Sequence, residues 1–281
     1  METTRPGRSV EADVLALEGE SRSRKTDAVV TEEPLELRLS DGTVSRTLAL
    51  TMRTPGNDFE LAAGFLYDEG IVTSRDDFAE ITYCLDPVLD PDQRYNVVTI
   101  ESRRRLDDAT LARFERHFTI GSACGVCGRA QLDSLRELGV APIADDVRIP
   151  TSLLYELPHR MHEAQRVFAA TGGLHAAALF DERGETIAVR EDVGRHNALD
   201  KLVGWGLLNN RLPFARSVLL VSGRASYEIL QKSLMARIPI VCSISAPSSL
   251  AVDLACEFNV TLAGFLRESR ANVYAGPERI T

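Results

Sequence analysis

Residues 152–281 alternate short apolar segments with stretches of helical pattern, and this alternation limits the possible folds more than any other feature. Strand-length apolar segments between helices are typical of α/β proteins, in which a mostly parallel sheet carries helices on its faces. The expected strands are LHAAALF, SVLLVS, PIVCSIS and TLAGFL. Residues 185–190 are expected to return beside LHAAALF across a turn at 181–184. The sequence therefore predicts an α/β domain over residues 151–281.

The first 150 residues predict a different organisation. Residues 1–25 are charged and lack a sustained period, so we expect a mobile lead-in. Residues 26–150 predict a smaller β-rich region that contains the segment 121–128 between two helical patterns. Alternating leucines around Asp41-Gly42 predict a hairpin, and RYNVVTI predicts another strand. FELAAGFLYDEG predicts a short helix between them.

The composition disfavours several classes of function. A chain of 281 residues buries roughly three quarters of its unfolded surface and needs no disulfide staples. A formal charge of −9 argues against a broad nucleic-acid surface, which requires clustered Lys and Arg in excess. No apolar run approaches the ~20 residues that span a bilayer, so no membrane insertion is expected. The five cysteines are odd in number and mostly scattered, and no signal peptide precedes them, so we expect a cytoplasmic protein.

The one close pair of cysteines lies in GSACGVCG, residues 121–128. Cys124 and Cys127 are compatible with half of a zinc site, a redox dithiol or a sulfur nucleophile, because an accessible thiolate is the reactive form of cysteine. Structural zinc is disfavoured, since the chain contains no second C-x-x-C and no H-x₃₋₅-H. A zinc deaminase is disfavoured because H-x-E does not precede the cysteines. A thioredoxin-type dithiol is expected after the first strand of a small domain, which is not the position of this pair.

Two predicted strands end in turns that are rich in hydrogen-bond donors. Residues 222–226 include Ser222 and Arg224, and residues 243–249 contain four serines before a predicted helix. In open α/β sheets ligands bind beyond the carboxyl ends of the strands, where loops lead into helix N-termini. These turns therefore predict either a phosphate or nucleotide site or ordinary capped turns. Neither turn contains a Walker A or a complete G-x-G-x-x-G motif, so the spacing of residues does not distinguish a nucleotide site from ordinary capped turns.

A third cluster, EDVGRHNALDK at residues 191–201, brings acid, base and imidazole groups to the start of a helix. Asp192 and His196 are four residues apart, so Asp192 either orients the imidazole or caps the helix through its own side chain. His175 begins an apolar strand and is a candidate for the same crevice, although a single histidine at that position is also compatible with a structural role.

Several long motifs, in order along residues 26–281, identify a family. They are EEPLELRLSDG with TMRTPGNDFELAAGFLYDEGI, CGVCG, TGGLHAAALF, EDVGRHNALDKLVG, SGRASYEILQKS, SAPSSLAVDLA and TLAGFLRESRANVYAGPERI. The chain closely resembles the FdhD family of formate dehydrogenase accessory sulfurtransferases. The resemblance implies a cytidine-deaminase-like fold for the C-terminal domain.

The resemblance also implies a function. Proteins of this family are sulfur carriers that accept persulfide sulfur from a cysteine desulfurase. They deliver it to the molybdenum cofactor, in its bis(molybdopterin guanine dinucleotide) form, before insertion into apo-formate dehydrogenase. Cys124 matches the family's persulfide position, and Cys127 is expected to accept, assist or resolve. A symmetric homodimer would suit a cofactor that carries two guanine nucleotides. The sequence alone leaves the oligomeric state open.

The family's cofactor-binding segment maps onto residues 265–270, after the last predicted strand. Guanine nucleotides such as GDP are expected at the same site. Arg267 and Arg270 suit bidentate recognition of phosphate, although without the family they would be a solvated face. The sequence departs from the family pattern at two positions. Glu268 places a negative charge between the two arginines, and Ala123 stands beside Cys124 where a hydroxyl is expected. The predicted cofactor-binding residues are Phe265, Leu266, Arg267, Glu268, Ser269, Arg270, Ser222, Arg224, His175 and His196. A cofactor-binding chaperone without sulfur transfer is the alternative function.

Overall fold

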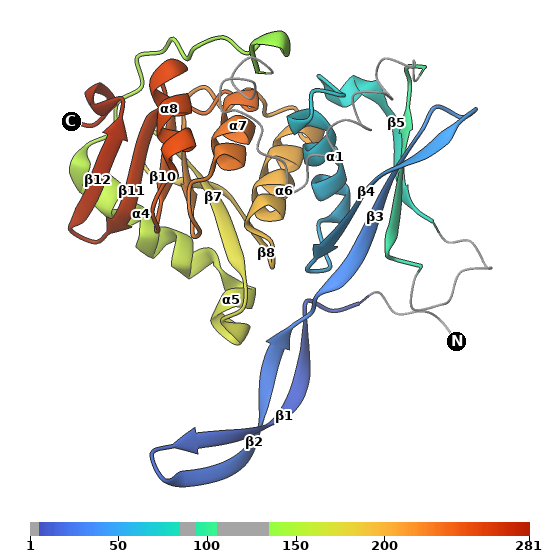
Figure 1. Ribbon diagram of the computed structural model, residues 1–281, viewed down its shortest axis with the longest axis vertical. Helices are drawn as coiled ribbons and strands as arrows, with labels where there is room; N and C mark the ends of the chain where they lie inside the picture. The colour runs from blue at the N-terminus through green and yellow to red at the C-terminus, as the bar shows by residue number, and fades with distance from the viewer. Residues whose placement is uncertain (1–5, 85–93, 106–134) are drawn as a thin grey trace.

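The computed structural model describes residues 6–84, 94–105 and 135–281. Residues 152–281 form a six-stranded sheet with the strand order β12-β11-β10-β9-β7-β8 (Figure 1). Its strands are β7 (His175–Asp181), β8 (Thr186–Asp192), β9 (Ser217–Val221), β10 (Ile240–Ser243), β11 (Thr261–Arg267) and β12 (Arg270–Ala275). Strands β9, β10 and β11 are parallel, whereas β7 and β12 run in the opposite direction to their neighbours.

The predicted α/β class is confirmed, but the sheet is mixed rather than mostly parallel. The turns after β7 and after β11 contain only a few residues, and connections this short join antiparallel strands, whereas parallel strands need a crossover of a dozen or more residues. The turn at 181–184 and the return strand β8 match the sequence prediction. The strand β12 was not predicted.

Helices cover both faces of this sheet. The helices α6 (Arg195–Leu208), α7 (Tyr227–Met235) and α8 (Ser249–Glu257) pack on one face, and α4 (Thr151–Ala164) packs on the other (Figure 1). Side chains alternate between the two layers, since Leu219 lies in the core under α6 to α8 and Leu220 lies in the core under α4. The single helix expected over 152–169 is interrupted at Gln165 and continues as α5 (Arg166–Thr171).

The N-terminal half contains a separate four-stranded sheet in the order β4-β3-β6-β5. Its strands are β3 (Glu33–Ser40), β4 (Ser45–Arg53), β5 (Phe78–Tyr83) and β6 (Val97–Ser102). The predicted hairpin is confirmed, with Gly42 at a φ of 81° in the turn between β3 and β4. The predicted helix is α1 (Asp58–Asp68), which packs its buried leucines on this sheet. Two short 3-10 helices, Arg75–Asp77 and Pro277–Arg279, complete the described elements.

Residues 9–30 form an arm of two paired strands, where a mobile lead-in was expected for residues 1–25. Strand β1 (Ser9–Glu18) and strand β2 (Ser21–Val30) pair in antiparallel register along their whole lengths and project from the body (Figure 1). Gly19, at a φ of 59°, makes the turn between them. Small apolar residues alternate along β1, but charged residues lie between them, so the sequence pattern did not predict this strand.

The two halves meet where α1 crosses α6. A Cβ atom on Gly64 would lie 1.8 Å from the carbonyl oxygen of Asp200, and a Cβ on Gly204 would lie 1.8 Å from that of Glu60. Only glycine permits this approach of two helix backbones. An ion pair between Arg190 and Glu60, with an Nε–Oε2 distance of 2.5 Å, joins the same halves. Among the described residues, no helix is long and apolar enough to cross a membrane.

A buried charge cluster lies beside this crossing. Lys232 of α7 is 2.5 Å from Asp200 of α6 and 3.6 Å from Asp68 of α1, and all three side chains are buried. Burial raises the pKa of Asp68 well above its ordinary value, only partly opposed by Lys232, and the charge of Asp200 raises it further. Burial alone would lower the pKa of Lys232, but the charges of Asp200 and Asp68 raise it. Lys232 lies closer to Asp200 than to Asp68, and the raised pKa of Asp68 favours its protonated form.

The raised pKa of Asp68 favours a proton in the folded protein that the unfolded chain releases above about pH 4. The free energy of unfolding should therefore fall as the pH rises above about 4. We predict that Asp68→Asn, which imitates the protonated carboxyl group, flattens this slope in urea unfolding measured from about pH 4 to 8. Asp253→Asn, at an exposed position of α8, is the control and should keep the wild-type slope. If the free energy of unfolding changed with pH by the same amount in the wild type and in Asp68→Asn, Asp68 would be ionised in the folded protein.

Candidate functional site

The carboxyl ends of β8, β9, β10 and β11 and the first residues of β7 and β12 meet at one edge of the sheet. The helices α6, α7 and α8 begin at this edge, directly after β8, β9 and β10. Their free N–H groups and helix dipoles favour negative charge there, although the whole chain carries −9.

Ser222 and His175 join β9 to the start of β7. The hydroxyl of Ser222 accepts a hydrogen bond from the N–H of Ala176 at 2.9 Å and lies 3.3 Å from Nδ1 of His175. Burial lowers the pKa of His175, and the positive charge of Arg195 lowers it further, which favours a neutral imidazole. A Cβ on Gly223 would lie 3.2 Å from Cδ of Arg195 and 3.4 Å from His175 Nδ1, so the glycine lets these two side chains approach the loop.

The two predicted serine-rich turns lie side by side. Ala225 and Pro247 form a parallel β-bridge, and the N–H of Ser248 donates to the carbonyl of Ala225 at 2.9 Å. The hydroxyl of Ser248 accepts a hydrogen bond from the N–H of Ala251 and caps α8. Ser226 precedes α7 but makes no such cap. The turns after β9 and β10 therefore form one continuous rim.

Residues 265–270 continue this rim, but they do not follow the last strand as expected. Phe265 to Arg267 belong to β11, and Arg270 begins β12, so the segment is a hairpin end. Phe265 has a φ of 54°, is 41% exposed, and donates its N–H to the carbonyl of Ser245. Leu266 is fully buried in the core under α4, which removes its side chain from any ligand surface.

The predicted charged residues of this segment have different surroundings. Arg267 donates to the carbonyl of Ile244 at 2.5 Å, so it ties β11 to the neighbouring turn. Arg270 and Arg224 are exposed. Glu268 instead lines an open hollow against Tyr155 and His159 of α4. This hollow lies on the face of the sheet opposite to α6, α7 and α8. Ser269 is exposed at the turn.

The edge is long enough for an extended ligand. His175 begins β7, and β9 and β10 separate it from β11, which bears Phe265. With strands ~4.8 Å apart, three steps place β7 and β11 about 14 Å from each other. The histidine end and the Phe265–Arg270 end are thus two regions of one rim rather than one cluster.

His196 lies beside His175 but faces a different hollow. Its Nε2 is 2.7 Å from Oε2 of Glu228 and 3.3 Å from the hydroxyl of Ser226. The hydrogen bond with His196 lowers the pKa of Glu228. Both residues line a cavity of about 210 Å³ between the two halves, which also includes Phe65 and Lys232 in its wall. Asp192 makes none of these contacts, so it is not the residue that orients His196.

Asp192 instead joins the two halves of the chain at the end of β8. Its buried carboxylate pairs with Lys201 at 2.6 Å and accepts hydrogen bonds from the N–H groups of Thr54 and Gly194 and from the side chain of Asn197. Lys201 also donates to the carbonyl of Thr54 at 2.8 Å. Burial lowers the pKa of Lys201, and the charge of Asp192 opposes that change. This network holds the start of α6 against the end of β4.

Sequence reasoning missed three residues of this region. Arg195 lies against Gly223, and its buried Nε has no hydrogen-bond partner within the described part of the chain. Glu228 pairs with His196, and Lys201 pairs with Asp192. Arg195 and Lys201 lie within the EDVGRHNALDK motif, which was available as a signal. Cys124 and Cys127 lie outside the described residues, so their predicted role stays a prediction.

Comparisons with known proteins agree over nearly the whole chain. A model of the FdhD/NarQ family matches residues 30–281. A Streptomyces coelicolor protein named sulfur carrier protein FdhD is 54% identical over 262 residues, covering 92% of this chain and 90% of its own length. A protein of that name from Sulfurisphaera tokodaii is 43% identical, with coverages of 95% and 97%. The crystal structure of a protein described as a formate dehydrogenase accessory protein, from Desulfotalea psychrophila, has the same fold. Its TM-score is 0.72 at 24% identity, over 98% of this chain and 100% of that one.

Asp192→Asn should leave the Lys201 charge buried without its partner, which destabilises a protein by about 3–5 kcal/mol. We predict that urea unfolding shows a decrease of this size in the free energy of unfolding. Adding Lys201→Met should restore part of that free energy, because the two side chains act as one unit. Asp146→Asn, which breaks an exposed ion pair with Arg216, is the matched control and should leave the midpoint unchanged. Strictly additive effects of the two core substitutions would contradict the coupling.

Proposed function

The chain belongs to the FdhD/NarQ family, and on this premise we propose that it is a sulfur carrier in the maturation of formate dehydrogenase. The observation that carries the proposal is the 54% identity, over nine tenths of both chains, with a protein named sulfur carrier protein FdhD. The name of the Desulfotalea psychrophila structure, a formate dehydrogenase accessory protein, connects the fold with that enzyme.

We propose Cys124 as the residue that carries the sulfur. Its thiolate would attack the terminal sulfur of a persulfide on a cysteine desulfurase. The sulfur–sulfur bond of the donor breaks, a new one forms on Cys124, and the donor cysteine leaves as a thiolate, so no external oxidant or reductant is needed. Small residues around Cys124 in GSACGVCG limit steric hindrance to both donor and acceptor. Cys127 is three residues away and is the candidate to assist or resolve.

The acceptor is the molybdenum cofactor in its bis(molybdopterin guanine dinucleotide) form, which is the cargo of the reaction. The rim at the carboxyl edge suits such an anionic, elongated molecule. Three helix N-termini and the unpartnered Nε of Arg195 supply donors, and Arg224 and Arg270 add exposed positive charge. Phe265 offers an exposed ring for stacking on a base. The apo-form of formate dehydrogenase would then receive the cofactor.

The alternative is a chaperone that binds the cofactor and delivers it without transferring sulfur. The same rim would serve that role, and the cysteines would be dispensable. Both functions therefore require the rim, whereas only the sulfur carrier requires Cys124.

Cys124→Ala should abolish activation of formate dehydrogenase while leaving the affinity for GDP unchanged, because the substitution removes the sulfur carrier and not the binding rim. The measurements are enzyme activity in a reconstituted maturation assay and calorimetric titration with GDP. Arg270→Ala is the reciprocal variant: its GDP affinity should fall about tenfold or more, as loss of a charged hydrogen bond predicts. Full activation by Cys124→Ala would favour the chaperone.

A further inference from the structure

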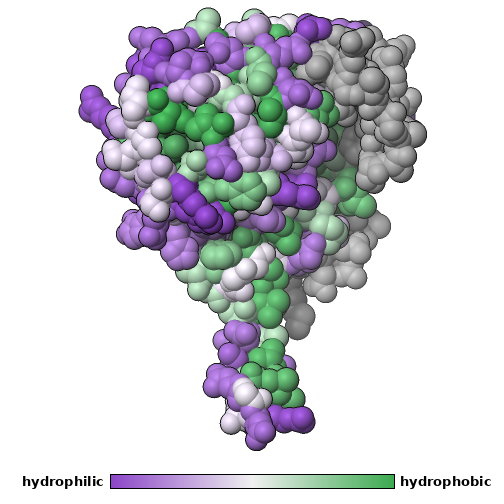
Figure 2. Space-filling model, turned by 60° about the vertical axis from the view of Figure 1, so that its left-hand side comes forward, coloured by the Kyte–Doolittle hydropathy of each residue, from purple (hydrophilic) through white to green (hydrophobic). Residues whose placement is uncertain are grey.

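Two aromatic side chains of the β11–β12 hairpin are exposed. Phe265 of β11 is 41% exposed, and Tyr274 of β12 is 36% exposed. Strand β12 forms the outer edge of the six-stranded sheet (Figure 1). The space-filling view brings this side of the molecule forward and shows hydrophobic side chains in small patches between hydrophilic ones (Figure 2). Exposed apolar groups that gather at one place mark binding surfaces, whereas single ones are ordinary.

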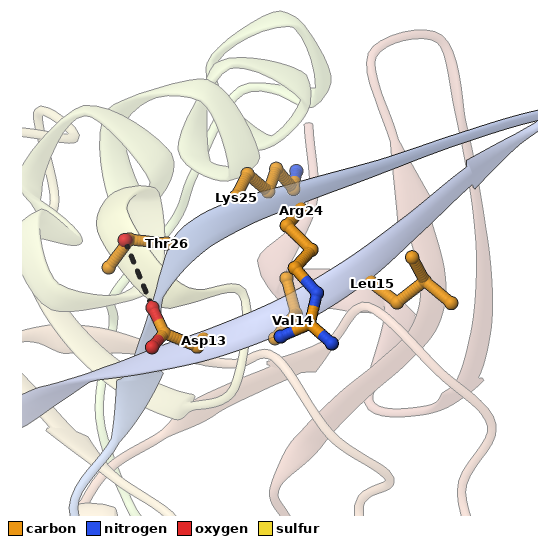
Figure 3. A pocket seen from close by; sticks show the side chains of 6 residues that line it. All are labelled: Asp13, Val14, Leu15, Arg24, Lys25 and Thr26. Atoms are coloured by element: carbon orange, nitrogen blue, oxygen red, sulfur yellow. Dashed lines mark hydrogen bonds between the residues drawn. The ribbon is translucent and has the colours of Figure 1, made fainter.

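The arm also exposes apolar side chains, but they do not suit a planar ligand. Leu15 and Leu17 are exposed there. The hollow along the arm is lined by aliphatic, hydroxyl and charged side chains, among them Val14, Leu15 and Arg24 (Figure 3). Residues 9–30 contain no aromatic residue. A planar ring therefore finds a stacking surface at the β11–β12 hairpin and not on the arm.

Tyr274 is the extra residue of a β-bulge in β12. Its neighbours Val273 and Ala275 pair with consecutive residues of β11, so the register skips Tyr274. A bulge leaves the extra residue out of the ladder and redirects side chains, and bulges are over-represented at sheet edges and beside active sites. The exposure of the Tyr274 ring is thus a consequence of the strand pairing.

A second bulge lies directly after Gly264. Phe265 and Leu266 of β11 together oppose the single residue Ala271 of β12. Phe265 has a φ of 54°, a left-handed conformation that is an outlier for a bulky side chain, and its N–H bond to the carbonyl of Ser245 holds it there. Strained conformations of this kind cluster at active sites and ligand clamps. The two bulges therefore place both exposed rings next to Gly264.

Gly264 makes room for the ring of Tyr274. A Cβ atom on Gly264 would lie 3.1 Å from Cε2 of Tyr274, 2.9 Å from Cδ of Pro247 and 3.2 Å from the carbonyl oxygen of Ser245. The ring consequently lies against the backbone of β11 beside Pro247, and its hydroxyl is 3.5 Å from Nδ2 of Asn272. An aromatic ring that is held in place and still partly exposed loses little conformational entropy when a ligand stacks on it.

Groups that bind phosphate lie at the same end of the rim. The helix α8 begins directly after the turn that contains Pro247, and Arg270 is exposed at the start of β12. Arg270 is four residues from Tyr274, which corresponds to about 13 Å at ~3.4 Å per residue. An extended nucleoside diphosphate can bridge this separation, with its base on the ring and its phosphates at the arginine and the helix N-terminus.

We propose that Tyr274 is the platform on which the base of the guanine nucleotide stacks. This assignment rests on the proposed function, which supplies the nucleotide, and it adds a residue outside the segment 265–270. Stacking on an aromatic side chain requires a ring held in one position, and Gly264 and Pro247 hold this one. The arginine end binds the phosphates, so the two parts of the nucleotide depend on different residues.

The test compares a nucleotide with its phosphate part alone, by calorimetric titration of the full-length protein. Tyr274→Leu should weaken GDP binding about tenfold, as loss of one base–aromatic stack predicts, and should leave the affinity for inorganic diphosphate unchanged. Arg270→Ala should weaken the binding of both ligands. Tyr274→Phe should bind GDP as the wild type does, because the ring and not the hydroxyl makes the stack.

The matched control is Val273, the exposed neighbour of Tyr274. Val273 pairs with Ala263, whose side chain lies in the core under α4, so its own side chain is on that face of the sheet. Val273→Ala should bind GDP and diphosphate with wild-type affinity. A general effect of substitutions in β12 would instead weaken this variant as well.

An indole ring at the same position supplies an optical readout that does not depend on removing the side chain. Tyr274→Trp should retain the affinity for GDP, and the fluorescence of the new indole should be quenched as GDP saturates the site but not as diphosphate does. Val273→Trp should show no quenching by GDP. The wild type, whose single tryptophan is Trp205, gives the background signal.

The outcomes separate the platform from the proposed function. Wild-type GDP affinity in Tyr274→Leu, equal losses for GDP and diphosphate, or no quenching in Tyr274→Trp would each overturn the platform, and a weakened Arg270→Ala would still support the rim. A wild type that binds no GDP would also overturn the platform, whereas sulfur transfer is decided separately by Cys124→Ala.

Discussion

The carboxylate of Asp192 is the interaction on which the geometry of the rim depends. It ends β8, neutralises the buried Lys201, and accepts hydrogen bonds from Thr54 of the N-terminal half and from Gly194 at the start of α6. Breaking a buried pair of this kind is costly because the remaining charge has no solvent to stabilise it. Its position fixes where α6 begins, and with it the placement of Arg195 and His196.

The α1–α6 crossing and the Asp192 network together hold in place the edge at which we propose that the anionic cofactor binds. Gly64 and Gly204 allow the two halves to approach closely, and the buried carboxylates there are balanced by Lys201 and Lys232. At that edge the helix N-termini and exposed arginines determine the local field, whatever the net charge of the chain.

Much of this architecture could be predicted from the sequence, because short apolar strands between amphipathic helices have few alternative packings. The loops at Ser222 and Ser248 were placed correctly for that reason. Periodicity does not reveal which residue a side chain contacts across the fold, so the pairing of Asp192 with Lys201 rather than His196 was missed. Leu266 was carried into the site by motif alignment, although strand alternation sends it into the core. The arm was missed because charged neighbours interrupt the alternation of apolar residues in β1.

If sulfur travels on Cys124, as we propose, the mass of the protein after reaction with its donor reports it. The full-length chain would be incubated with a cysteine desulfurase and cysteine, alkylated, digested and analysed by mass spectrometry. We expect the peptide containing residues 121–128 to gain the mass of one sulfur atom on Cys124, and reduction before alkylation to remove this added mass. An unmodified Cys124, or sulfur found only on Cys84, Cys242 or Cys256, would contradict the claim.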